Sequence, residues 1–151
     1  MKAEQVIPFA EAAVSVLREM LGSDVTRGDL AMRTKVIPTR GIAVIIGVVG
    51  QLRGRVVFDL DTPTALKLAA QLNGEEFTAI DPLVQSTLNE IANISSGRAV
   101  GVLCGQGCEC DITPPVLLHG DTVTVTTDLP ALAIPLHTAC GELIINVAVR
   151  D

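Results

Sequence analysis

The strongest constraint on the fold is a helical pattern that the chain carries twice. Residues 6–22 (VIPFAEAAVSVLREMLG) and residues 80–96 (IDPLVQSTLNEIANISS) align with Pro8 over Pro82, and their apolar positions coincide. Each segment has the apolar spacing of an amphipathic helix, and each leads into β-branched runs. Such a repeat predicts an internally duplicated unit, in which a helix is followed by antiparallel strands.

Periodicity along the chain predicts three helices and six strands. We expect helices at 5–21, 64–72 and 83–100, and strands at 32–37, 42–49, 55–60, 122–127, 132–137 and 142–149. The first three strands are expected to form an antiparallel meander. Asp81, and Asp61 or Thr62, precede prolines and are the expected N-caps of the later helices. The sequence therefore predicts one domain over residues 1–151 with a two-layer α+β fold, its long helices packed on a six-stranded sheet.

The helix expected at 83–100 has an unusual polar face. Glu90 and Asn93 are three positions apart, which places their side chains about 60° apart on one face, where both can reach one target. Amides, hydroxyls and a glycine make up the rest of that face: Gln85, Ser86, Asn89, Ser96 and Gly97. Interior Asn and Ser each cost a helix about 0.5 kcal/mol relative to Ala, a cost that a docking surface would explain.

Two interpretations of this polar face are open. It is either a docking surface or simply the solvent side of a helix that packs on the core. In the alignment of the two copies, Val16 and Glu19 are the counterparts of Glu90 and Asn93. The polar face then occurs in one copy only, which favours docking, because mere solvation would be needed in both copies.

Composition excludes several classes of function. The net charge is −6 and no cluster of Lys and Arg is present, which argues against a nucleic-acid partner. The chain has no Trp or Tyr and three Phe, too few aromatic side chains to line a typical small-molecule pocket. Its longest apolar stretch, Ile42 to Val49, is much shorter than a membrane span, and the N-terminus lacks the pattern of a signal peptide. We expect a cytoplasmic protein without a membrane partner.

The cysteines offer an alternative reading as a metal or thiol site. Cys104, Cys108 and Cys110, with His119, supply four possible zinc ligands. Their spacing differs from the paired Cys-x2-Cys units of structural zinc sites. Free thiols are therefore the expected state of all four cysteines, Cys140 included.

The order of motifs resembles the CheC/CheX/FliY family of bacterial chemotaxis phosphatases, most closely its single-site CheX branch. The similarity extends over nearly the whole chain. It rests on Pro8-Phe9, Gly47-x-x-Gly50-x-x-x-Gly54 before Val56-Val57, Ala65 to Ala69, Glu90-Ile91-Ala92-Asn93-Ile94, Thr113-Pro114 ahead of Gly120, and Gly141-Glu142. The resemblance implies a CheC-like fold and hydrolysis of the phosphoaspartate of a CheY-like receiver domain.

The resemblance also implies roles for individual residues. Asn93 would direct a water molecule at phosphorus, and Glu90 would pair with the receiver's active-site lysine. Ser86, Asn89, Ser96 and Gly97 would contact the receiver. The receiver would supply Mg²⁺, so no cofactor or metal is expected on this chain.

The first helix reads Glu11-Ala12-Ala13-Val14, without an Asn at the fourth place, so one active helix per chain is expected. The CheX branch forms homodimers by joining sheets, and the strand Leu143 to Val149 is a candidate edge. Two other functions stay open: a non-catalytic domain that binds a receiver or a flagellar-switch component, and a thiol or zinc protein built on Cys104, Cys108 and Cys110.

Overall fold

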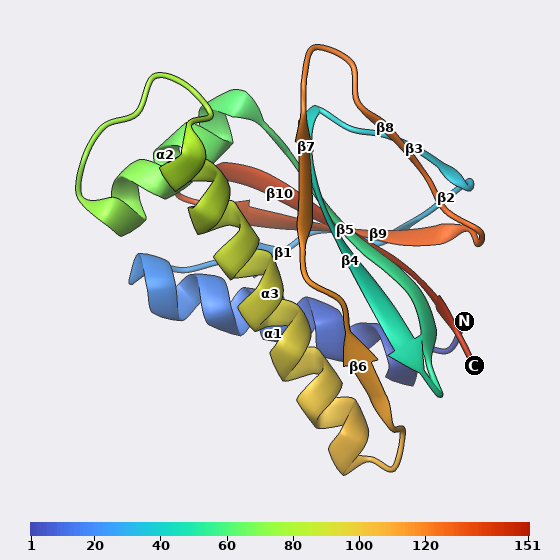
Figure 1. Ribbon diagram of the computed structural model, residues 1–151. Coiled ribbons are helices and arrows are strands. Elements are labelled where there is room, and N and C mark those ends of the chain that lie inside the picture. The colour runs from blue at the N-terminus through green and yellow to red at the C-terminus, as the bar shows by residue number, and fades with distance from the viewer.

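The computed structural model describes all residues, 1–151, and contains three helices and ten strands (Figure 1). The helices are α1 (Ala3–Leu21), α2 (Thr62–Asn73) and α3 (Pro82–Gly105). The strands are β1 (Thr26–Arg27), β2 (Ala31–Arg33), β3 (Val36–Pro38), β4 (Gly41–Gly50), β5 (Arg53–Asp61), β6 (Cys110–Ile112), β7 (Val116–His119), β8 (Thr124–Thr126), β9 (Ala131–Thr138) and β10 (Gly141–Arg150). No helix combines the length and apolar composition that crossing a membrane requires.

Eight strands form one antiparallel sheet, and β3 and β8 form a separate two-stranded ribbon. The order in the sheet is β1-β9-β10-β5-β4-β6; β2 also pairs with β9, and β7 also pairs with β4. The sheet has eight strands in place of the six expected, because two short strands make up each edge, and the strand expected at 122–127 lies in the separate ribbon as β8. The expected meander is wrong in part: β2 pairs with β9 and β3 with β8, so among the three strands of the expected meander only the last two, β4 and β5, pair with each other.

The internal duplication is confirmed by the strand pairing. Five strands follow α1 and five follow α3, and each pairing in one half has its counterpart in the other. The β4–β5 hairpin matches the β9–β10 hairpin, while β1 and β2 on β9 match β6 and β7 on β4. The two halves meet at the central pair of β5 and β10, where Phe58 lies opposite Ile145. A pseudo-two-fold axis therefore runs through the sheet centre.

The structure corrects the alignment of the two helices. Ala3 begins α1 and Pro82 begins α3, so their starts are 79 positions apart, whereas Pro8 lies inside α1. The same separation relates Glu19 of α1 to Arg98 of α3. The Arg98 guanidinium donates two hydrogen bonds to the Glu19 carboxylate, at 3.0 and 2.8 Å, and this bidentate ion pair joins the two helices. This separation also superposes buried positions of the two helices, such as Phe9 on Leu88 and Ala13 on Ala92.

This offset changes the counterparts of the polar pair. Glu90 corresponds to Glu11, and Asn93 to Val14, in place of the predicted Val16 and Glu19. The first copy therefore keeps the carboxylate and lacks the carboxamide.

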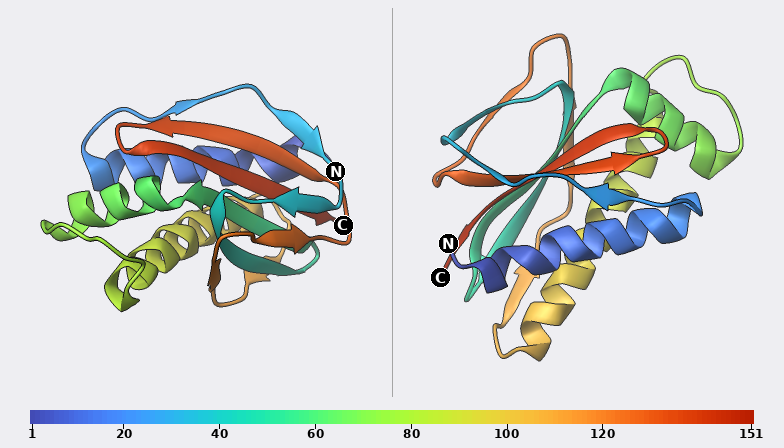
Figure 2. Two further views of the ribbon diagram at one scale, coloured as in Figure 1. Left: turned by 90° about the horizontal axis from the view of Figure 1, so that it is seen from above. Right: turned by 180° about the vertical axis from the view of Figure 1, so that it is seen from behind.

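Core side chains cover both faces of the sheet. On one face, α1 and α3 pack against strand residues such as Val44, Phe58 and Ile145, which form the main core (Figures 1 and 2). On the other face, the β3–β8 ribbon covers a smaller cluster that includes Ala43 and Val57. Neighbouring residues along a strand point to opposite faces, so β4 and β5 contribute to both layers.

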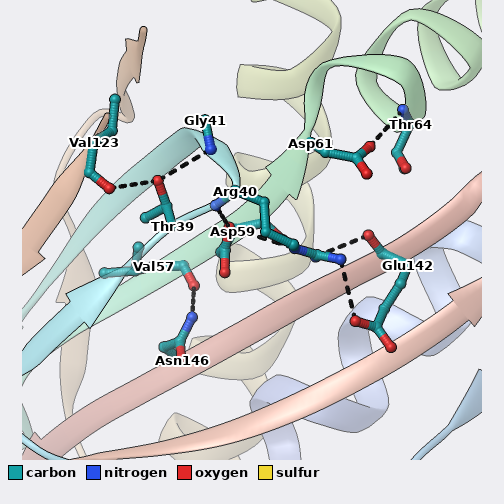
Figure 3. Close-up of polar contacts among 10 residues, drawn as sticks. All are labelled: Thr39, Arg40, Gly41, Val57, Asp59, Asp61, Thr64, Val123, Glu142 and Asn146. Atoms are coloured by element: carbon teal, nitrogen blue, oxygen red, sulfur yellow. Dashed lines mark hydrogen bonds and ion pairs between the residues drawn. The ribbon is translucent and has the colours of Figure 1, made fainter. Parts of the chain in front are cut away.

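A polar network joins the two halves beside the central strands (Figure 3). The Arg40 guanidinium donates to the backbone oxygens of Asp59 and Glu142 at 3.1 and 3.0 Å, and to the Glu142 carboxylate at 3.1 Å. The Arg40 backbone N–H donates to the Asp59 carboxylate at 2.8 Å, and the Asp59 side chain is only 2% exposed. Nearby, buried Asn146 donates to the Val57 carbonyl oxygen at 3.2 Å. One arginine thus holds both β5 and β10.

Candidate functional site

Helix α3 begins with a well-formed N-cap. Asp81 has extended backbone geometry, and its carboxylate accepts a hydrogen bond from the Val84 backbone N–H at 2.8 Å. Pro82 occupies the first helical position, where its missing N–H costs nothing. Gln85 folds back and donates from its amide to the Ile80 carbonyl oxygen at 3.1 Å. These bonds fix the first turns of α3, from which the candidate site residues project.

The candidate site is an open groove of about 680 Å³ along one side of α3. Four of the predicted site residues line it: Ser86, Asn89, Glu90 and Asn93. Glu90, Asn93 and Ser86 are exposed, while Asn89 is half-buried. Glu90 and Asn93 are neighbours one turn apart on the exposed face, which is the arrangement that the sequence predicted.

The opposite wall of the groove is a segment that sequence reasoning did not assign to the site. It consists of residues 112–115, where β6 gives way to Thr113-Pro114-Pro115. Thr113 fastens the wall to β4: its backbone N–H donates to the Gly47 carbonyl oxygen at 2.9 Å, and its hydroxyl accepts from the Gly47 N–H at 2.8 Å. A Cβ at Gly47 would lie 2.9 Å from that hydroxyl oxygen, which explains the glycine.

The chemistry of the groove is that of a positioning site. Glu90 is the only charged residue that lines it. Neither the Glu90 carboxylate nor the Asn93 carboxamide makes a hydrogen bond or ion pair within the chain, so both are free to contact a partner. The lining contains no cysteine, histidine or lysine. The groove can therefore orient a water molecule through the Asn93 carboxamide and pair with a cation through the Glu90 carboxylate.

The predicted role of Ser96 is wrong. Its side chain is buried, with 1% exposure, and its hydroxyl has no hydrogen-bond partner. The physical reason is that Ser96 stacks on one helix face with Ala92, Ala99 and Leu103, which are all buried in the core, so the core-packing face of α3 extends to Ser96. Gly97, one turn beyond Asn93, is exposed as predicted, and a Cβ added there would meet only Ile112 at 4.0 Å.

The thiol and zinc readings gain no support from the geometry. The structure brings together no group of three or more His, Cys, Asp and Glu side chains that could hold a metal ion. All four cysteines are free. Burial, with smaller contributions from Cys108 and Cys104, raises the pKa of the Cys110 thiol to about 11. A thiol with that pKa is protonated at neutral pH and is a poor nucleophile.

Comparison with known proteins identifies the family. Residues 42–137 match the sequence model of the family described as chemotaxis phosphatase CheX. The chain belongs to the CheX family. It is 25% identical to the CheY-P phosphatase CheX of Thermotoga maritima over 143 aligned residues. The alignment covers 94% of this chain and 92% of that protein. Recognition of the family from its motifs is thus confirmed.

Solved structures agree with this assignment. A CheC-like superfamily protein from Shewanella sp. PV-4 has a TM-score of 0.89 at 22% identity, with 100% of both chains covered. The matching chain in the CheX–CheY–BeF3–Mg complex of Borrelia burgdorferi has a TM-score of 0.80 at 31% identity, with 97% of each chain covered. The CheC-like fold predicted from the sequence is therefore confirmed.

Proposed function

We propose that this CheX-family protein removes the phosphoryl group from the phosphoaspartate of a CheY-like receiver domain in the cytoplasm. The observation that carries the proposal is the free Glu90–Asn93 pair in an open groove whose lining has no histidine, cysteine, lysine or arginine. Such a groove needs a partner that brings both the phosphoryl group and positive charge, which a Mg²⁺-loaded receiver does. The Borrelia relative was solved as a complex with CheY, BeF3 and Mg²⁺.

The Asn93 carboxamide suits the task of placing the attacking water. Its oxygen accepts a hydrogen bond from water, and its nitrogen donates to a phosphoryl oxygen, so it works without changing its protonation state. The water attacks phosphorus in line as the bond to the aspartate oxygen breaks, which yields inorganic phosphate and the free carboxylate. Glu90 pairs with the receiver's active-site lysine. Ser86, Asn89 and Gly97 contact the receiver, and this chain binds no cofactor.

Phosphate release tests the proposal directly. Receiver domains of the same organism would be charged with an acyl phosphate in the presence of Mg²⁺, and the loss of phosphate would be followed with and without this protein. Acceleration is expected with at least one receiver. Binding without acceleration would instead support the non-catalytic docking domain, the second function that the sequence left open.

Gly97→Leu is expected to weaken receiver binding several-fold without unfolding the protein. Gly97 is exposed beside Asn93, and the space around it is open, so the leucine would project toward the partner. The receiver's dissociation constant and the melting temperature of the variant check this prediction. An unchanged dissociation constant would remove Gly97 from the interface.

A homodimer of this protein joins two sheets, and the edge available for joining differs from the one predicted. The candidate edge, Leu143 to Val149, lies in β10, which is paired on both sides. The open edges are β1–β2 and β6–β7. Both edges expose apolar side chains, which favour pairing with another chain: Val116 and Leu118 on β6–β7, and Leu30 and Met32 on β1–β2. The β6–β7 edge also carries the wall of the groove, so a second copy paired there would lie beside the site. The β1–β2 edge lies at the opposite side of the sheet and leaves the groove open.

Met32→Lys is expected to convert the dimer to a monomer, because a charge on the edge strand opposes the pairing of two sheets. Sedimentation equilibrium at micromolar concentrations measures the change. The phosphatase activity per chain should persist in the monomer, since the groove lies at the other edge. A wild type that sediments as a monomer would contradict the proposed dimer.

A further inference from the structure

A second hollow lies beside the candidate site, on the other side of Glu90. Its volume is about 400 Å³, and three helices enclose it: Met20 comes from α1, Leu72 and Asn73 from α2, and Leu83, Ser86, Thr87, Glu90 and Ile91 from α3. Ser86 and Glu90 line both this hollow and the site groove. Since residues four apart stack on one helix face, these two side chains form a ridge between the two hollows.

The hollow offers an apolar surface. Leu83 is 43% exposed, and Met20 and Leu72 are partly buried against the core, so their free faces line the hollow. Away from the ridge, the polar groups of the wall bond to each other: the Asn73 amide donates to the Thr87 hydroxyl at 2.9 Å, and that hydroxyl donates to the Leu83 carbonyl oxygen at 2.8 Å. A ligand in the hollow would therefore meet mostly carbon.

The hollow exists on one side of the pseudo-two-fold axis only. Helix α2 supplies its outer wall, and α2 is the helix that the two-fold relation leaves without a counterpart (Figure 1). On α1, the position equivalent to Leu83 is Glu4, a charged residue. The apolar hollow and the carboxamide of Asn93 thus both occur in the second copy alone, side by side. This coincidence indicates that they belong to one contact surface.

We infer that the Leu83 hollow receives an apolar side chain that the receiver domain presents beside its phosphorylated aspartate. The inference rests on the proposed function and adds to it a determinant of partner choice. A receiver that pairs with Glu90 must lie over the ridge, and the hollow begins at that ridge. The hollow then contributes affinity, and the discrimination between receivers depends on the size of the side chain that enters it.

Leu83→Glu tests the inference, with Val102→Glu as the matched control. Both leucine and valine are exposed on α3, at 43% and 49%, but Val102 lies near the far end of the helix. Leu83→Glu is tolerated by the fold, because an acidic residue in the first turn favours the helix. It is expected to weaken binding of the Mg²⁺- and beryllofluoride-loaded receiver about tenfold, by loss of apolar contact and burial of a charge. Val102→Glu is expected to leave that affinity unchanged.

The rate of hydrolysis at saturating receiver separates this role from catalysis. Leu83→Glu should retain the wild-type rate there, because Asn93 is intact. If Leu83→Glu binds the receiver with unchanged affinity, and the wild type hydrolyses the phosphoaspartate, the inference about the hollow is wrong and the proposed function stands. A wild type that neither binds nor hydrolyses any receiver would overturn both. A change in sedimentation of Leu83→Glu, without a change in receiver affinity, would assign the hollow to a contact between copies and also overturn the inference.

Discussion

Asn93→Ala is expected to lower the rate of phosphate release at saturating receiver about a hundredfold. Removing one transition-state hydrogen-bond donor or water-positioning group typically costs a rate factor of about 10² to 10³. The stability of the fold should not decrease, because Asn93 is exposed and its side chain makes no hydrogen bond within the chain. Alanine is also a better helix former than asparagine. Single-turnover phosphate release from the phosphorylated receiver measures the rate, and thermal unfolding checks the fold.

Asn89→Ala is the matched control, since it removes the same side chain one turn earlier on the same groove. Asn89 is half-buried, and its amide oxygen has no hydrogen-bond partner, so its loss is expected to change receiver affinity and leave the saturated rate intact. Equal rates for Asn93→Ala and wild type would contradict water positioning by Asn93. The first copy is not expected to supply residual activity, because Val14 stands where Asn93 stands in the second.

The duplication could be predicted from the sequence, but its register could not. Helical spacing recurs in both halves, and this pattern is local. The predicted alignment was anchored on Pro8 and Pro82, which play different parts: Pro82 starts α3, while Pro8 lies within α1. The true offset is defined by which side chains are buried between the two helices, such as Phe9 and Leu88, and burial depends on packing.

The site could be predicted as far as local geometry determines it. The three-residue spacing of Glu90 and Asn93 places both on one face of any helix, and the structure has them there. Ser96 was misplaced because the limit of the exposed face depends on how α3 packs on the core, where Ala92, Ala99 and Leu103 beside it are buried. The wall at Thr113 was missed because it comes from pairing with Gly47, 66 positions away. The sequence carried two signals there, the family motif Thr113-Pro114 and the adjacent prolines Pro114 and Pro115, but neither indicates which helix the segment faces.

The order of the strands in the sheet could not be predicted from local sequence patterns either. Leu143 to Val149 is apolar throughout, and such a run suits either an edge that pairs with another chain or a strand buried between two neighbours. The structure pairs it with β5 and β9. The pairing of β10 with β5 joins residues more than 80 positions apart in the sequence, and it depends on the arrangement of the whole fold.

Arg40→Met is expected to destabilise the protein by about 2 kcal/mol and lower its melting temperature by roughly 6 °C. Methionine keeps the apolar stem and removes the guanidinium, which bonds to β5 through Asp59 and to β10 through Glu142. The buried Asp59 carboxylate then keeps only the backbone N–H of residue 40. The expected loss is smaller than for a fully buried ion pair, because the Arg40 side chain is 32% exposed. Thermal and urea unfolding measure the loss.

The pH dependence of this loss separates a charge effect from lost packing. Burial raises the pKa of the Asp59 carboxyl, and the Arg40 N–H and charge oppose that rise. Without the guanidinium the folded-state pKa rises further above the unfolded value of about 3.9. Protonation of Asp59 then favours the folded variant, so the variant's loss of unfolding free energy relative to the wild type should be smallest near pH 4 and should grow toward neutral pH.

Arg98→Met is the control, because it breaks the exposed ion pair with Glu19, and it should cost less stability than Arg40→Met. A deficit of Arg40→Met that is constant between pH 4 and pH 7 would mean that packing, and not the buried carboxylate, makes Arg40 necessary.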